Sequence, residues 1–95
     1  MYTIKVYSAV KQDAKKLDRE LQREIKERHF PNIEQNPFQA NPLSYQFKGL
    51  WPYHVNYQGS QYRIVYAVYP EDKCVLVIMI GPREGFYETL RRRIK

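Results

Sequence analysis

Residues 53–80, YHVNYQGSQYRIVYAVYPEDKCVLVIMI, decide the fold because three β-strand patterns follow one another within them. Tyrosine and valine alternate with polar residues along 53–57, and a second alternating segment, 62–69, begins after the hairpin signal Gln58-Gly59-Ser60. After a second turn, the unbroken apolar run 74–80 is typical of a central strand that is buried on both faces. The stretch therefore predicts three antiparallel strands in sequence order.

The segment before these strands changes to a helical period. Residues 3–7 alternate and are rich in β-formers, which predicts a first strand, and Ser8 is a typical helix N-cap. Apolar residues then recur every three or four positions, which predicts one amphipathic helix with the stripe Val10, Ala14, Leu17, Leu21 and Ile25. Pro31 is expected to end this helix or to begin a short second one.

The remaining segments complete the predicted order of elements. Tyr45, Phe47 and Leu50 are expected to form one strand that bends at Trp51-Pro52. Residues 86–95 are long enough for a final helix. The fold class is α+β with the order β-α-α-β-β-β-α. We expect one domain, residues 1–95, in which a helical pair packs on one face of an antiparallel sheet and a short C-terminal helix follows.

The composition is that of a compact basic domain. The chain carries 16 Lys and Arg against 10 Asp and Glu, and its 43% hydrophobic residues are too many for a disordered basic tail. A single Cys excludes an internal disulfide, and with two His it also excludes zinc-finger ligand sets, so we expect no metal and no cofactor. No segment is typical of a signal peptide or a membrane span, and we expect a cytoplasmic protein without a membrane partner.

The positive charge is unevenly placed. Residues 1–47 contain eight basic and six acidic side chains, whereas residues 48–95 contain eight and four. Mixed signs at helical spacing in the first half indicate a solvated helix face. The basic excess therefore belongs to the strands and the C-terminal segment, which favours an anionic partner: RNA, DNA or an acidic protein.

The sequence contains none of the common enzyme signatures. Its glycines do not form a phosphate-binding loop, and it has no nucleophile elbow, His-Glu-x-x-His motif or paired acidic cluster. Arginines, tyrosines and a histidine remain as reactive groups. Such groups suit RNA transesterification without a metal, in which cations stabilise developing charge, a base accepts the 2′-OH proton and aromatic rings hold splayed bases.

A series of motifs resembles the RelE branch of the RelE/ParE toxin superfamily. It consists of Lys48-Gly-Leu-Trp-Pro-Tyr-His-Val, Tyr62-Arg-Ile-Val-Tyr66, Val75-Leu-Val-Ile-Met-Ile-Gly81, Arg83 and Tyr87. RelE-like toxins cut mRNA in the ribosomal A site and are held inactive by an acidic antitoxin. The resemblance implies a RelE-like microbial RNase fold, with ribosome-bound mRNA, 16S rRNA and a cognate acidic antitoxin as partners.

The resemblance also implies roles for individual residues. Arg63 matches the arginine that stabilises the charged transition state, and Arg83 matches a second arginine near the scissile phosphate and the leaving group. Tyr87 matches the tyrosine that stacks on the substrate base. His54 and Asn56 stand where the best-studied members carry two lysines, so we expect His54 to be the base, because an imidazole accepts a proton near neutral pH.

Further residues are expected to contact RNA: Lys48, Asn56, Gln61, Arg91 and Arg92, with Arg93 in the same basic run. Each has an ordinary alternative, because polar residues are common at sheet edges and cations at a helix C-terminus complement its dipole. For the catalytic set, Arg63 could instead pair with Glu71, Asp72 or an acidic residue of a helix, and Tyr87 could simply pack beside Phe86.

Three functions stay open on the sequence alone. The leading one is a ribosome-dependent mRNA endoribonuclease that leaves a 2′,3′-cyclic phosphate and a 5′-OH. A ParE-like inhibitor of DNA gyrase or topoisomerase has the same fold and needs no RNA-cleaving residues, and the absence of lysine at positions 54 and 56 favours it. A basic RNA-binding module without catalysis would show only a salt-dependent affinity.

Overall fold

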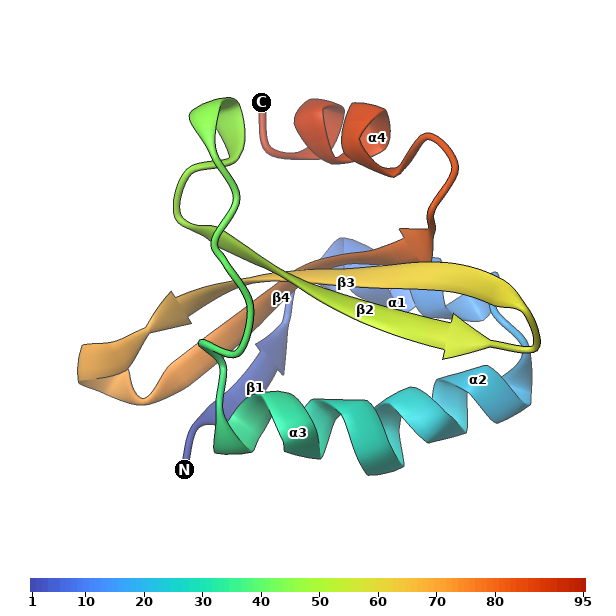
Figure 1. Ribbon diagram of the computed structural model, residues 1–95, viewed down its shortest axis with the longest axis horizontal. Coiled ribbons are helices and arrows are strands. Elements are labelled where there is room, and N and C mark those ends of the chain that lie inside the picture. The colour runs from blue at the N-terminus through green and yellow to red at the C-terminus, as the bar shows by residue number, and fades with distance from the viewer.

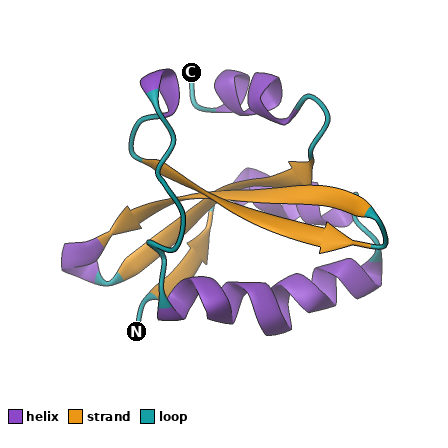
Figure 2. Cartoon of the chain, in the orientation of Figure 1, coloured by secondary structure: helices purple, strands orange, loops and turns teal.

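The computed structural model covers residues 1–95 and consists of one four-stranded sheet with helices on both faces (Figure 1, Figure 2). The strands are β1 (Thr3–Val6), β2 (Leu50–Tyr57), β3 (Ser60–Tyr69) and β4 (Cys74–Pro82). The helices are α1 (Ser8–Lys15), α2 (Arg19–Glu24), α3 (Phe30–Gln35) and α4 (Phe86–Arg93), with a π-helical turn η1 (Ile25–His29) and two 3-10 turns, η2 (Tyr45–Phe47) and η3 (Pro70–Asp72). None of these helices is long and apolar enough to cross a membrane.

The strand order in the sheet is β1-β4-β3-β2. β3 pairs antiparallel with both β2 and β4, whereas β1 runs parallel to β4. The α+β class and the order of elements are confirmed, but the sheet is mixed and the expectation of a purely antiparallel sheet is wrong. The helices after β1 return the chain to the end of the sheet at which β1 began, so β2 runs in the same direction as β1. β4 is antiparallel to β3, which is antiparallel to β2, so β4 also runs in the direction of β1.

The apolar stripe expected to form one helix is divided between two. α1 ends at Lys15, and the extended Asp18 precedes α2. From there α2, η1 and α3 continue as one helical rod along the sheet (Figure 1). Pro31 does not end this rod but stands in the first turn of the short helix α3, the second of its two expected positions. The wider π-helical turn Ile25–His29 just before it makes room for its ring.

The segment before β2 also differs from expectation. Tyr45–Phe47 is a 3-10 turn rather than a strand, and β2 begins only at Leu50. Trp51 and Pro52 lie within β2 instead of marking a bend. Pro52 is tolerated there because β2 is an edge strand, so the missing N–H breaks no inner ladder.

Two apolar clusters fill the two faces of the sheet. The larger one joins α1, α2, η1 and α3 to the sheet through Val10, Leu21, Ile25, Ile33, Val55, Tyr57, Ile64, Tyr66, Val75, Val77 and Ile80. The smaller one packs α4 on the other face through Val65, Met79, Phe86 and Leu90. The β3–β4 register contains a bulge, where Val65 pairs with Met79 but Tyr66 pairs with Val77. β4 contributes side chains to both clusters. β4 is central in the sheet, as expected, and packs on both faces, although Cys74, Leu76 and Ile78 are only partly buried.

Candidate functional site

The strand residues predicted to act on RNA converge on one end of the β2–β3 hairpin. His54 lies opposite Arg63 in the register, and Asn56 lies opposite Gln61. Directly paired residues of antiparallel strands project their side chains to the same face of the sheet. Together with Tyr62, these four line a shallow hollow of about 100 Å³.

Arg63 is the cation of this hollow. Its guanidinium carbon lies 5.5 Å from the centre of the Tyr87 ring, at cation–π distance. Its Nε is buried and has no hydrogen-bond partner. The alternative of an ion pair with Glu71 or Asp72 is wrong, because the salt bridges of the structure are Glu24–His29 and Asp13–Arg93. A buried guanidinium N–H without an acceptor is suited to an anionic ligand that supplies one.

Tyr87 is held in place by two other rings. Its centroid lies 5.5 Å from that of Phe47 in η2 and 5.4 Å from that of Phe86 in α4. The ordinary alternative of packing beside Phe86 is therefore correct, and it is compatible with the contact to Arg63. The packing orients the ring at the margin of the hollow rather than leaving it free to rotate.

Arg83 lies in the turn that joins β4 to α4. Its backbone N–H donates to the Gln61 carbonyl at 3.0 Å, which places the turn beside the start of β3. The chain then enters α4 through Gly85, whose φ of 66° is the left-handed conformation that glycine adopts without strain. The side chain of Arg83 is exposed.

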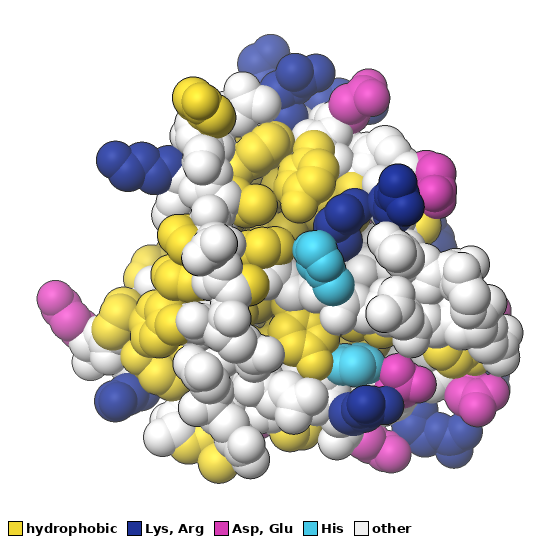
Figure 3. Space-filling model, in the orientation of Figure 1, with side chains coloured by type: hydrophobic (Ala, Val, Ile, Leu, Met, Phe, Trp, Pro, Cys, Tyr) yellow, Lys and Arg dark blue, Asp and Glu magenta, His cyan; other side chains and the backbone are white.

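The other predicted RNA contacts lie apart from the hollow. Lys48 is exposed at the end of η2, and Arg91 and Arg92 are exposed on α4. The two arginines line a second hollow of about 680 Å³. Figure 3 shows basic side chains gathered over α4 on this side of the molecule. Arg93 is instead engaged with Asp13 inside the structure.

A polar network around the buried His29 was not predicted from the sequence. His29 Nδ1 is hydrogen-bonded to the Tyr53 hydroxyl at 2.7 Å, and its Nε2 to a Glu24 oxygen at 2.8 Å. Asn32 Nδ2 also donates to that hydroxyl at 3.2 Å. The network fastens the helical rod to β2 at the residue before His54. One feature of the sequence could have indicated that His29 is buried: it follows Ile25 by four residues and so continues the apolar stripe of the helix.

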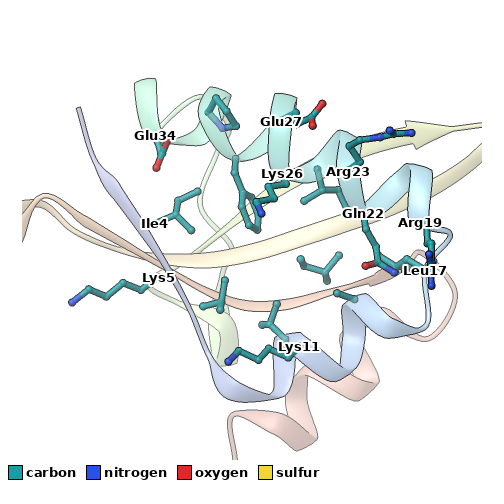
Figure 4. Close-up of a pocket in the computed structure, with 17 residues that line it drawn as sticks. Ile4, Lys5, Lys11, Leu17, Arg19, Gln22, Arg23, Lys26, Glu27 and Glu34 are labelled. Atoms are coloured by element: carbon teal, nitrogen blue, oxygen red, sulfur yellow. Dashed lines mark hydrogen bonds between the residues drawn. The ribbon is translucent and has the colours of Figure 1, made fainter.

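A larger groove lies between β1, α1 and the helical rod (Figure 4). It has a volume of about 1140 Å³ and a partly apolar floor. Its charged rim is formed by Lys5, Lys11, Arg19, Arg23, Lys26, Glu27 and Glu34. β1 is an edge strand, so one side of its backbone is not paired within the sheet. The groove therefore combines apolar surface, an open strand edge and an excess of cations.

No group of three or more His, Cys, Asp and Glu side chains is placed to hold a metal ion. The side chains predicted to act on RNA offer Arg63 and Arg83 as cations, His54 as a proton acceptor and Tyr87 as an aromatic surface. This combination suits the stabilisation of a charged phosphoryl centre next to an acceptor for a hydroxyl proton.

Comparisons with known proteins agree with this fold. The chain is similar to a RelBE toxin–antitoxin complex from Mycobacterium tuberculosis, with 22% identity, 86% of this chain and 98% of that chain covered, and a TM-score of 0.73. It is similar to the isolated Escherichia coli RelE toxin (24% identity, 100% of both chains, TM-score 0.68). It is also similar to the archaeal RelE–RelB complex from Pyrococcus horikoshii (20% identity, 87% of this chain and 96% of that chain covered, TM-score 0.63).

The fold is thus that of the RelE toxins. A family model for the ParE-like toxins of type II bacterial toxin–antitoxin systems matches residues 4–91. The chain belongs to this family, and its predicted membership of the RelE/ParE superfamily is confirmed. A comparison with curated proteins gave no match.

Proposed function

We propose that this toxin is an endoribonuclease that cleaves ribosome-bound mRNA in the A site, in the cytoplasm, and so inhibits translation. The observation that carries the proposal is Arg63. The side chain of Arg63 lines a hollow together with His54 across the strand pair. Its buried Nε has no hydrogen-bond partner, and Tyr87 covers its guanidinium. A phosphodiester supplies the acceptors that this group lacks.

The proposed reaction needs only the substrate and these side chains. His54 accepts the proton of the ribose 2′-OH, whose oxygen forms a bond to the adjacent phosphorus. The bond from phosphorus to the 5′ oxygen breaks, and that oxygen takes up a proton from solvent beside Arg83. The products are a 2′,3′-cyclic phosphate and a 5′-OH. Arg63 stabilises the charge on the pentacoordinate phosphorus, and Tyr87 stacks on a neighbouring base.

An acidic antitoxin is the proposed second partner, and the groove of Figure 4 is its proposed binding site. Five cations and two carboxylates line the groove rim, so an acidic segment is attracted to it. The apolar floor accommodates one face of an amphipathic helix, and the open edge of β1 can pair with an added strand. Two of the similar structures are complexes of a toxin with its antitoxin.

A ParE-like inhibitor of gyrase or topoisomerase is the second candidate. The description of the family model and the absence of lysine at positions 54 and 56 favour it. The test adds purified toxin to a translating extract and maps mRNA 5′ ends by primer extension, with a gyrase supercoiling assay in parallel. Codon-phased ends support the nuclease. Intact mRNA with blocked supercoiling supports the inhibitor, and RNA binding without either effect supports a binding module.

A further inference from the structure

The turn η2 presents one aromatic side chain almost entirely to solvent. Tyr45 is 94% exposed, and its φ of 58° lies in the left-handed region that bulky residues rarely adopt. The turn holds this conformation through the Lys48 N–H, which donates to the Tyr45 carbonyl at 3.0 Å. Phe47 of the same turn packs on Tyr87. The exposed ring is thus displayed from a fixed position.

Cations of α4 lie on the same side of the molecule as this turn. Gln46 of η2 shares a hollow of about 680 Å³ with Glu88, Arg91, Arg92, Ile94 and Lys95. Figures 1 and 2 both show η2 beside α4. We call the set formed by Tyr45, Gln46, Lys48, Arg91, Arg92 and Lys95 the anchor surface. Arg93 does not belong to it, because Asp13 holds its guanidinium.

The chemistry of the anchor surface favours RNA over a protein partner. Only one of the six residues that line the hollow is hydrophobic, so the hollow beside the turn lacks the continuous apolar patch that the core of a protein interface requires. An exposed ring on a turn that borders a hollow lined by Arg91, Arg92 and Lys95 is instead an arrangement that binds unpaired nucleotides: the base stacks and the phosphates contact Lys and Arg.

We propose that the anchor surface binds an unpaired RNA segment at a site separate from the cleavage hollow, with one base stacked on Tyr45 and the flanking phosphates on Arg91, Arg92 and Lys48. The inference rests on the proposed function in that RNA is the target of the toxin. The anchor surface adds a second RNA contact, in addition to the cleavage hollow. This contact fixes the position of the RNA-bound toxin and takes no part in the reaction.

The test measures binding of a fluorescein-labelled 2′-O-methyl oligouridine of about 12 nucleotides to the full chain by fluorescence anisotropy. The 2′-O-methyl group removes the attacking hydroxyl, so binding is measured without cleavage. Tyr45→Ala is expected to weaken binding roughly 5- to 150-fold, whereas Tyr45→Trp retains it. Tyr69→Ala is the matched control, since Tyr69 is also an exposed tyrosine (47%) but is not part of η2 and does not line the hollow. The Kd of this variant is expected to equal that of the wild type.

Two further variants distinguish a loss of RNA binding from a loss of stability. Tyr45→Gly relieves the left-handed φ, so it is expected to raise the Tm while it weakens RNA binding. The double variant Arg91→Ala with Arg92→Ala is expected to lower the slope of log Kd against the logarithm of the salt concentration by about 1.4, because two phosphate contacts of a single strand are lost. A fall of both Tm and affinity in Tyr45→Gly would indicate a structural role and overturn the proposal.

The remaining outcomes are equally decisive. An unchanged Kd in Tyr45→Ala overturns the proposal, as does Tyr45-dependent binding of polyglutamate or of phosphatidylserine vesicles in place of RNA. The assay contains no ribosome and no cleavable bond. A toxin that makes no cuts in the translating extract but binds RNA through Tyr45 therefore contradicts the proposed nuclease while it supports the anchor surface.

Discussion

Asp13 and Arg93, 80 residues apart in the sequence, form a two-pronged ion pair that covers the open edge of β4. The two terminal nitrogens of Arg93 donate to the Asp13 carboxylate at 2.6 and 2.8 Å, and one of them also donates to the Ile78 carbonyl at 2.9 Å. Asp13 in turn accepts the Ile80 N–H at 3.0 Å. β1 pairs with β4 only as far as Val77, so these backbone groups have no strand partner on that side.

The first prediction follows from this pair. Asp13→Ala leaves a largely buried guanidinium and the Ile80 N–H without an acceptor, so the free energy of unfolding is expected to fall by about 3 kcal/mol. Urea unfolding followed by circular dichroism measures it. The control is Glu71→Ala, an exposed carboxylate in η3, for which a change within about 0.5 kcal/mol is expected. Equal effects of the two variants would show that the pair does not stabilise the fold.

The second prediction concerns the base. His54→Ala is expected to lower the cleavage rate roughly 10²- to 10⁴-fold, because the ribose hydroxyl loses its proton acceptor. Added imidazole is expected to restore part of this rate. Asn56→Ala, which removes a neutral side chain from the same strand face, serves as the control and is expected to have a much smaller effect. Wild-type cleavage by His54→Ala would exclude His54 as the base.

The third prediction concerns alkaline stability. Burial raises the pKa of Tyr66 from 10.0 to about 12, and its hydroxyl donates to the Pro37 carbonyl at 2.7 Å. Because the folded pKa lies above the unfolded one, the contribution of the neutral phenol is fully present below pH 10 and is lost as the pH rises towards 12. Tyr66→Phe is expected to cost about 1 kcal/mol at pH 7 and to flatten the loss of stability above pH 10.

Urea unfolding of both proteins at a series of pH values tests this, with Tyr45→Phe as the control because Tyr45 is exposed. The same decline above pH 10 in the wild type and in Tyr66→Phe would show that another group governs the alkaline transition.

The fourth prediction concerns the antitoxin. Reversing two charges of the groove rim, Lys11→Glu with Arg23→Glu, is expected to weaken binding of the cognate acidic antitoxin at least tenfold and to slow association. Surface plasmon resonance at two salt concentrations measures both effects. Lys15→Glu is the matched control, because Lys15 is exposed on α1 but does not line the groove. Equal affinities of the two variants would place the antitoxin elsewhere.

The part of the site on β2 and β3 could be predicted because strand alternation and hairpin register determine it. The period of two places His54 and Arg63 on one face, and the turn at Gln58-Gly59 makes them opposite one another. Tyr87 and Arg83 could be associated with them only through the family resemblance. Their approach depends on how α4 packs back on the sheet, and that packing is a long-range property.

Other features left no local signal. The stripe continues through Leu17 without interruption, so the break between α1 and α2 could not be read from the apolar period. The direction of β1 relative to β4 is not encoded in either strand. Arg93 has the same local sequence character as Arg91 and Arg92, and only the position of Asp13 in the folded chain distinguishes it.

The most direct test of the proposed nuclease is the count of codon-phased mRNA 5′ ends in a translating extract for the wild type, Arg63→Ala and Arg28→Ala. Arg28 is an exposed arginine of η1 and controls for loss of one positive charge. The wild type and Arg28→Ala are expected to cut equally, and Arg63→Ala is expected to cut roughly 10²- to 10³-fold more slowly. Cleavage that is absent in the wild type, or undiminished in Arg63→Ala, would contradict the proposed mechanism.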